Sequence, residues 1–153
     1  MRRKEREILD KGIIEDILNK EYLCRIGLVD AGRPYVVPMV YGYKDHALWM
    51  HSAKTGRKAE LIKANKEVCF EIESQLKLLP GELACNWSIR FRSIIGYGEA
   101  SFVESLEDKE RGLQAIMKNC TGRGDFTFPK DSLTGLGIIK VEIVSLTGKQ
   151  ANF

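Results

Sequence analysis

The chain has 153 residues, of which 44% are hydrophobic and 29% charged, which is the composition of an ordinary globular domain. It contains no apolar run long enough to span a membrane, and no apolar segment of a secretory signal follows its basic N-terminus, so we expect one cytoplasmic domain covering residues 1–153. The net charge of +3 is too small to indicate a nucleic-acid partner.

The four cysteines are widely spaced and include no C-x-x-C pair. In a cytoplasmic chain this spacing does not indicate disulfides. Cys24 and Cys69 lie in apolar, strand-like stretches, where a free cysteine packs as a small hydrophobic residue. Two histidines and scattered cysteines offer no clustered ligand set, so we predict no metal site.

The first third of the chain predicts one helix followed by short strands. Asp10 is a candidate N-cap, and apolar residues recur after it at helical spacing. Residues 22–29 and 34–43 predict a hairpin, because turn residues separate two stretches rich in strand-forming side chains. Pro38 has no N–H for a ladder, so we expect an edge position or a bulge there. Residues 46–51 predict a third strand.

Beyond a short helix that ends near residue 65, alternation predicts a half-buried strand over residues 67–74. Residues 77–86 contain Pro-Gly and predict a loop. A long strand is expected over residues 87–103. Gly96 and Gly98 lie on one face of that strand, which indicates a bend or the close approach of another backbone.

The last third predicts a helix, a loop and a strand. Ser105 is a candidate N-cap with Asp108 three residues later. Residues 121–135 are polar and contain Gly and Pro, which predicts a loop, and residues 136–146 alternate as a strand. Six strands without helices between most of them favour a mainly β (α+β) fold, a small antiparallel barrel with peripheral helices.

Residues 51–58, HSAKTGRK, carry the clearest chemical pattern in the chain. A strand ends, hydroxyl residues and Gly56 follow, and a helix opens with Arg57 and Lys58 in its first turn. Free N–H groups at a helix N-terminus attract anions, and Arg57 can make a two-pronged contact with phosphate oxygens. Two phosphate-binding patterns, G-x-x-x-x-G-K-[ST] and G-x-G-x-x-G, are absent. The pattern favours an anion site, and a solvated surface turn is the alternative interpretation.

Four stretches of the chain carry a family resemblance. They are CRIGLVDAGRPYVVPMVYGY (24–43), LWMHSAKTGRKAELIKANKEVCFEIE (48–73), CNWSIRFRSIIGYGEA (85–100) and TGK (147–149). In this order they resemble the pyridoxamine 5′-phosphate oxidase-related, FMN-binding split-barrel family, and within it the nitroimidazole-resistance (Nim-type) branch. The chain lacks the C-terminal Arg/His motif of true pyridoxamine-phosphate oxidases, which argues against vitamin-B6 oxidation.

The resemblance implies a six-stranded split barrel that forms a homodimer, with one FMN at each end of the subunit interface. It also implies three groups of cofactor-binding residues: one beside the isoalloxazine ring, one at the phosphate, and one contributed by the second subunit. In that order the groups are Val37, Pro38, Met39 and Val40; His51, Ser52, Ala53, Gly56, Arg57 and Lys58; and Trp87, Arg92 and Ser93.

We therefore expect an FMN-dependent oxidoreductase that takes electrons from a reduced nicotinamide or another donor and passes them to a small acceptor, such as a nitroaromatic. His51 is the candidate catalytic residue, as a proton source beside the flavin. A non-enzymatic flavin- or haem-binding sensor or carrier is the alternative. A third interpretation, nucleic-acid binding through the Lys and Arg residues of 54–63, is disfavoured by the modest charge.

Overall fold

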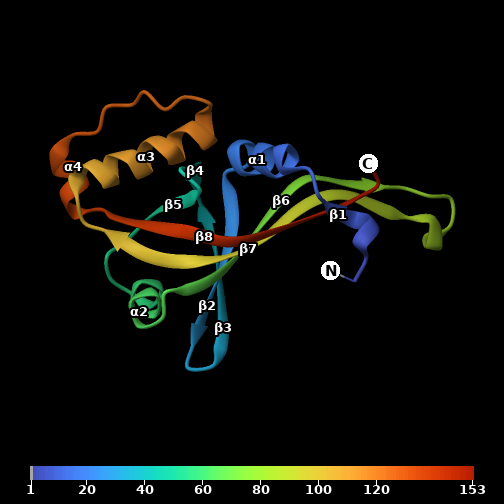
Figure 1. Ribbon diagram of the computed structural model, residues 1–153, viewed down its shortest axis with the longest axis horizontal. Helices are drawn as coiled ribbons and strands as arrows, with labels where there is room; N and C mark the ends of the chain where they lie inside the picture. The colour runs from blue at the N-terminus through green and yellow to red at the C-terminus, as the bar shows by residue number, and fades with distance from the viewer. Residues whose placement is uncertain (1) are drawn as a thin grey trace.

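A computed structural model describes residues 2–153. Its centre is one antiparallel sheet with the strand order β3-β2-β6-β7-β8-β5-β4, and β1 pairs with β8 (Figure 1). The strands are β1 (Glu7–Ile8), β2 (Leu23–Asp30), β3 (Arg33–Val40), β4 (Gly42–Lys44), β5 (Ala47–Ser52), β6 (Glu67–Leu79), β7 (Ser88–Val103) and β8 (Gly137–Ala151). The α-helices are α1 (Lys11–Lys20), α2 (Arg57–Ala64), α3 (Leu106–Thr121) and α4 (Lys130–Gly135).

The sheet curves until its two ends nearly meet. The strands at the two ends of the order, β3 and β4, are consecutive in the chain and are joined at Tyr41. This confirms the mainly β, split-barrel class, with eight strands in place of the six expected. The expected strand 34–43 is divided at Tyr41, and the two-residue strand β1 was not predicted.

Packing explains the division at Tyr41. Its side chain is fully buried, its N–H donates to the Tyr22 carbonyl at 2.9 Å, and its hydroxyl donates to the Leu18 carbonyl at 3.2 Å. At Gly42 the backbone passes so close to α3 that a Cβ would lie 2.0 Å from the carbonyl carbon of Ala115. The chain therefore leaves the line of β3 and re-enters the sheet as β4.

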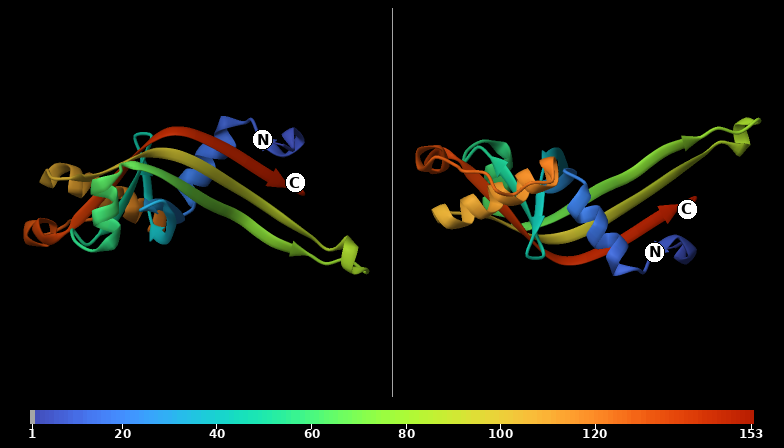
Figure 2. Two further views of the ribbon diagram at one scale, coloured as in Figure 1. Left: turned by 90° about the horizontal axis from the view of Figure 1, so that it is seen from below. Right: turned by 90° about the horizontal axis from the view of Figure 1, so that it is seen from above.

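The prediction of a loop over residues 77–86 was wrong in part. β6 continues to Leu79 and pairs with β7 beyond an irregularity between Ser74 and Lys77. The two strands form a long arm that projects from the barrel (Figures 1 and 2). Leu76 and Leu78 are both 60% exposed, so the arm lacks the buried face that produces a recognisable alternation.

Local signals located the helix starts correctly. Asp10 caps α1 by accepting the N–H of Gly12 at 2.7 Å, and Ser105 caps α3 by accepting the N–H of Asp108 at 3.1 Å. The expected loop 121–135, in contrast, contains α4. None of the helices in residues 2–153 has the length and apolar character needed to cross a bilayer.

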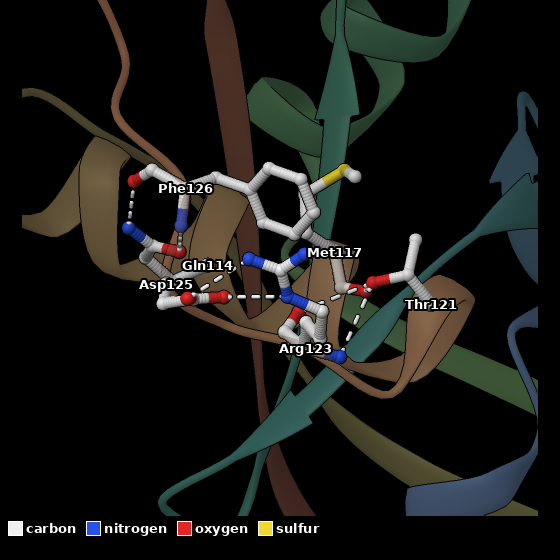
Figure 3. Close-up of polar contacts among 6 residues, drawn as sticks. All are labelled: Gln114, Met117, Thr121, Arg123, Asp125 and Phe126. Atoms are coloured by element: carbon white, nitrogen blue, oxygen red, sulfur yellow. Dashed lines mark hydrogen bonds and ion pairs between the residues drawn. The ribbon is translucent and has the colours of Figure 1, made fainter.

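The segment between α3 and α4 is held by side chains of α3 and by one ion pair of its own (Figure 3). Phe126 donates its N–H to the Gln114 amide oxygen at 3.1 Å, and the Gln114 amide nitrogen donates to the Phe126 carbonyl. Arg123 forms two hydrogen bonds with Asp125, both 3.0 Å long, and its N–H donates to Thr121 Oγ1 at 3.2 Å. These contacts order a stretch whose polar composition indicated only a loop.

The barrel interior is filled by the inward-facing strand residues, and Cys24 lies fully buried among them. The close approach of another backbone is confirmed at Gly98, where a Cβ would lie 2.4 Å from the Glu142 carbonyl oxygen. At Gly96 the close neighbour is a side chain instead, because a Cβ would lie 2.2 Å from the Phe70 ring. Trp49 lies outside the barrel, where it is 1% exposed in a second cluster with α3. α3 therefore covers one outer face of the sheet.

The buried amide of Asn119 joins three elements. Its Oδ1 accepts the Tyr43 N–H at 3.1 Å, and its Nδ2 donates to the carbonyls of Leu18 and Glu21, both at 2.7 Å. These partners belong to β4 and to the end of α1, while Asn119 itself lies on α3. The buried amide therefore satisfies backbone groups where the sheet and the two helices meet.

Replacing Asn119 with Ala is expected to lower the free energy of unfolding by about 3 kcal/mol, because buried backbone partners lose their hydrogen bonds. Urea titration would measure the change. Asn19→Ala is the matched control, since exposed Asn19 makes one local bond to the Glu15 carbonyl at 2.8 Å. Equal stability of the two variants would contradict the role assigned to Asn119.

Candidate functional site

The turn between β5 and α2 is open at the helix N-terminus. Gly56 precedes α2 with φ +96°, a conformation that disfavours side chains, and a Cβ there would meet no atom within 4 Å. No side chain in residues 2–153 caps this helix. The first N–H groups of α2 are therefore available to an anionic ligand.

Arg57, the first residue of α2, is held by the β2–β3 hairpin. Its Nε donates to Asp30 Oδ2 at 2.9 Å, and its Nη2 donates to the same oxygen. Its guanidinium carbon lies 4.7 Å from the centre of the Tyr35 ring. Asp30 therefore holds one edge of the guanidinium and Tyr35 one face, which leaves the remaining N–H groups for another acceptor.

Lys58 is half-buried, and its charge is poorly compensated. Its Nζ donates to the Met39 sulfur at 2.9 Å, and no carboxylate within residues 2–153 forms an ion pair with it. A thioether is a weak acceptor. Burial lowers the pKa of the Lys58 ammonium, because desolvation disfavours the charged form. A bound anion would supply the missing countercharge.

The strand expected beside the flavin ring is at the edge of the sheet. β3 ends the strand order, which confirms the edge position predicted from Pro38. Met39 is buried, whereas Pro38 is exposed. The contact between Met39 and Lys58 places β3 directly against the start of α2. The edge of residues 37–40 and the open helix end thus lie side by side.

The residues at the end of β5 point in different directions. Ser52 is 8% exposed and pairs with Gly137 in β8. His51 is exposed and, by the alternation of strand side chains, lies on the opposite face of β5 from Met50 and Ser52. Ala53 is exposed in the turn that follows.

The basic residues of 54–63 do not converge into one patch. Lys54 Nζ donates to the Thr134 carbonyl at 2.8 Å, and Lys63 Nζ lies 3.5 Å from the Lys54 carbonyl oxygen. Arg57 and Lys58 instead contact the β2–β3 hairpin. This dispersal argues against a continuous surface for nucleic-acid phosphates.

Trp87, Arg92 and Ser93 do not reach the open end of α2 within one chain. Arg92 and Ser93 belong to β7 and Trp87 directly precedes it. The arm that β7 forms with β6 extends along the long axis away from α2 (Figures 1 and 2). Trp87 is 50% exposed, and Arg92 contacts Gln150 at 3.2 Å and the Phe153 ring at 4.2 Å.

The sequence did not predict three features of the site. Asp30 and Tyr35 contact Arg57 from a segment that indicated only a hairpin. An apolar groove of about 580 Å³ also lies along β2, β6, β7 and β8, with Val29, Tyr97 and Val144 among its lining residues. Alternation could have shown that Tyr97 faces outward, but pairing across the sheet was needed to form the groove.

Comparisons with known proteins agree with this fold. Residues 10–150 match the family described as pyridoxamine 5′-phosphate oxidase. No curated protein matches the chain. Among solved structures, a candidate 5-nitroimidazole antibiotic resistance protein from Bacteroides thetaiotaomicron VPI-5482 is 33% identical with a TM-score of 0.83, over 94% of this chain and 86% of that one.

More distant structures share the fold alone. A FAD- and haem-binding protein from Mycobacterium smegmatis is 16% identical with a TM-score of 0.84, over 97% of this chain and 74% of that one. A flavocytochrome from Azotobacter vinelandii is 17% identical with a TM-score of 0.82, over 100% and 72%. Because the family match spans nearly the whole chain, the protein belongs to the pyridoxamine 5′-phosphate oxidase family, where it is similar to the nitroimidazole-resistance branch.

Proposed function

We propose that the chain is an FMN-dependent oxidoreductase that works as a homodimer, with a flavin phosphate held at the open end of α2. The observation that carries the proposal is the half-buried Lys58 ammonium, whose contact in this region is a thioether. Uncapped N–H groups and two cations at one helix N-terminus are unfavourable without an anion. A phosphate group would compensate all of them together.

The shape of the turn fits a phosphate group. Gly56 presents backbone without a side chain, so an anion can approach the first N–H groups of α2 closely. Arg57 keeps N–H groups beyond those that Asp30 occupies. Phosphate oxygens accept such donors strongly, because hydrogen bonds between charged partners are short and directional.

The neighbouring strand fits the flat ring of a flavin. Backbone groups on the outer edge of β3 lie at the end of the sheet, where a ring can take hydrogen bonds that a further strand would otherwise take. A bound flavin supplies the electron-transfer chemistry, and the protein binds, orients and shields it. Residues 37–40 would orient the ring while α2 holds the phosphate.

Haem or FAD is the second candidate occupant. This alternative is favoured by the distant structure described as a FAD- and haem-binding protein. The visible spectrum of the protein as purified separates these cofactors from each other, and extraction followed by chromatography separates FMN from FAD.

The double variant Arg57→Ala/Lys58→Ala is expected to weaken FMN binding about 100-fold, since each lost charge-assisted hydrogen bond contributes about 1.5 kcal/mol. Quenching of FMN fluorescence during titration would measure the affinity. Riboflavin, which lacks the phosphate, should bind the double variant and the wild type equally.

The control is Arg111→Ala/Lys118→Ala, which removes the same two side-chain types from the exposed surface of α3. This control should keep wild-type affinity for FMN. Unchanged FMN affinity in the Arg57/Lys58 variant would move the phosphate elsewhere.

The proposed site is incomplete in one chain, which supports the dimer. Trp87, Arg92 and Ser93 lie on or beside the arm, away from α2 of the same chain (Figure 1). The groove side chains Val29, Tyr97 and Val144 are 51%, 58% and 71% exposed. A contiguous apolar patch of this kind marks an interaction surface. A second copy would cover it and could bring its own arm to the flavin.

Tyr97→Asp is expected to shift a dimer to monomers, because a carboxylate would be buried without a partner at the interface. Sedimentation velocity would measure the mass in solution. Leu9→Asp is the control, since Leu9 is 82% exposed and is not among the groove residues. A wild-type chain that sediments as a monomer at all concentrations would refute the dimer.

With FMN bound, the protein is expected to oxidise a reduced nicotinamide in the presence of a nitroaromatic acceptor. His51→Gln should lower turnover at saturating FMN about 100-fold, the usual contribution of a general acid. His46→Gln is the control, because His46 lies exposed in the β4–β5 turn. Flavin binding without any turnover would favour the carrier or sensor.

A further inference from the structure

Asp30 occupies a specific place in the fold. It is the last residue of β2 and pairs in the sheet with Arg33, so it stands at the tip of the β2–β3 hairpin. Its carboxylate reaches across to the first residue of α2. Asp30 is not among the residues expected to bind the cofactor, and the sequence pattern around it indicates only a turn.

The contact with Asp30 orients the Arg57 guanidinium but occupies only some of its N–H groups. Both bonds from the guanidinium end on one carboxylate oxygen, Oδ2, from Nε and Nη2. The Tyr35 ring lies under the guanidinium at 4.7 Å and is itself packed against the barrel core. The Nη1 group and the second hydrogen of Nη2 keep their capacity to donate.

Such orientation matters because a long side chain at the surface is otherwise mobile. The Arg57 side chain is 61% exposed, and an unrestrained arginine loses much rotamer freedom when it grips a ligand. A guanidinium already fixed along one edge and one face loses less of this freedom on binding.

A second contact ties the same two segments together. Lys58 Nζ contacts the Met39 sulfur at 2.9 Å, so both cations at the start of α2 touch the β2–β3 hairpin. The hairpin carries residues 37–40, the strand proposed to orient the ring. The two ends of the proposed flavin site are therefore braced against each other through Asp30 and Met39.

We propose that Asp30 is a positioning residue, which holds Arg57 so that its remaining N–H groups grip the phosphate of the bound flavin. The inference rests on the proposed function. A carboxylate that merely competed with the phosphate for Arg57 would act in the opposite direction, and its removal would tighten binding.

The test is fluorescence titration of the full chain with FMN and, separately, with riboflavin. Asp30→Ala should weaken FMN binding about fivefold, in the range of an exposed ion pair, while riboflavin affinity stays unchanged. Asp30→Asn, which keeps an oxygen acceptor for the guanidinium, should recover part of the loss. In an Arg57→Ala background, Asp30→Ala should have no further effect on FMN.

Asp125→Ala is the matched control, because it breaks another exposed pair with arginine, that of Arg123. It should leave both affinities unchanged. Circular dichroism melting curves would show that each variant is folded.

Four results would overturn the inference while the proposed function stands. These are unchanged FMN affinity in Asp30→Ala, tighter FMN binding, an equal loss for riboflavin, and the same loss in the Arg57→Ala background. Failure of the wild-type chain to bind FMN would instead overturn the proposed function, and the inference with it.

Discussion

The closure of the sheet at Tyr41 and Gly42 is the constraint on which the rest of the structure depends. β3 and β4 lie at opposite ends of the strand order, yet they are joined by a single residue. The sheet must therefore curve until β3 comes near β5, which pairs with β4. The buried Tyr41 hydroxyl and the Asn119 amide stabilise this bend through bonds to the end of α1. Without this bend, β3 and the start of α2 would be separated by the width of the sheet.

Closure also decides the electrostatics of the candidate site. It places two cations of α2 against a hairpin that supplies one carboxylate, that of Asp30, and the thioether of Met39. The Arg57 charge is paired with the Asp30 carboxylate, whereas the Lys58 charge has only the Met39 thioether beside it. Positive charge at a helix N-terminus opposes the helix dipole by about 0.3–1 kcal/mol for each charge. The arrangement is poorly compensated by the chain itself, which is a usual property of sites that bind anions.

The long β6–β7 arm, and the groove at the opposite end of the same two strands, expose apolar side chains on the outside of the sheet. Leu76, Leu78 and Tyr97 are all more than half exposed, although they belong to the central strands of the sheet. Exposed apolar side chains on long hydrogen-bonded strands favour association with another chain, because burying that apolar surface is favourable. The proposed site, divided between α2 of one chain and the arm of another, would make cofactor binding depend on that association.

The sequence by itself determined the features that local chemistry controls. Asp10 and Ser105 cap their helices because a short polar side chain can reach N–H groups within three residues, and the missing N–H of Pro38 restricts β3 to an edge. The turn at Gly56 carries a local pattern that predicts an anion site, and the family resemblance indicates which ligand to expect there. Only the tertiary structure decided the contacts between distant segments, such as Asp30 with Arg57, and the extension of β6 and β7 into an arm. Neither leaves a local pattern, because each depends on which strands pair and how far the sheet curves.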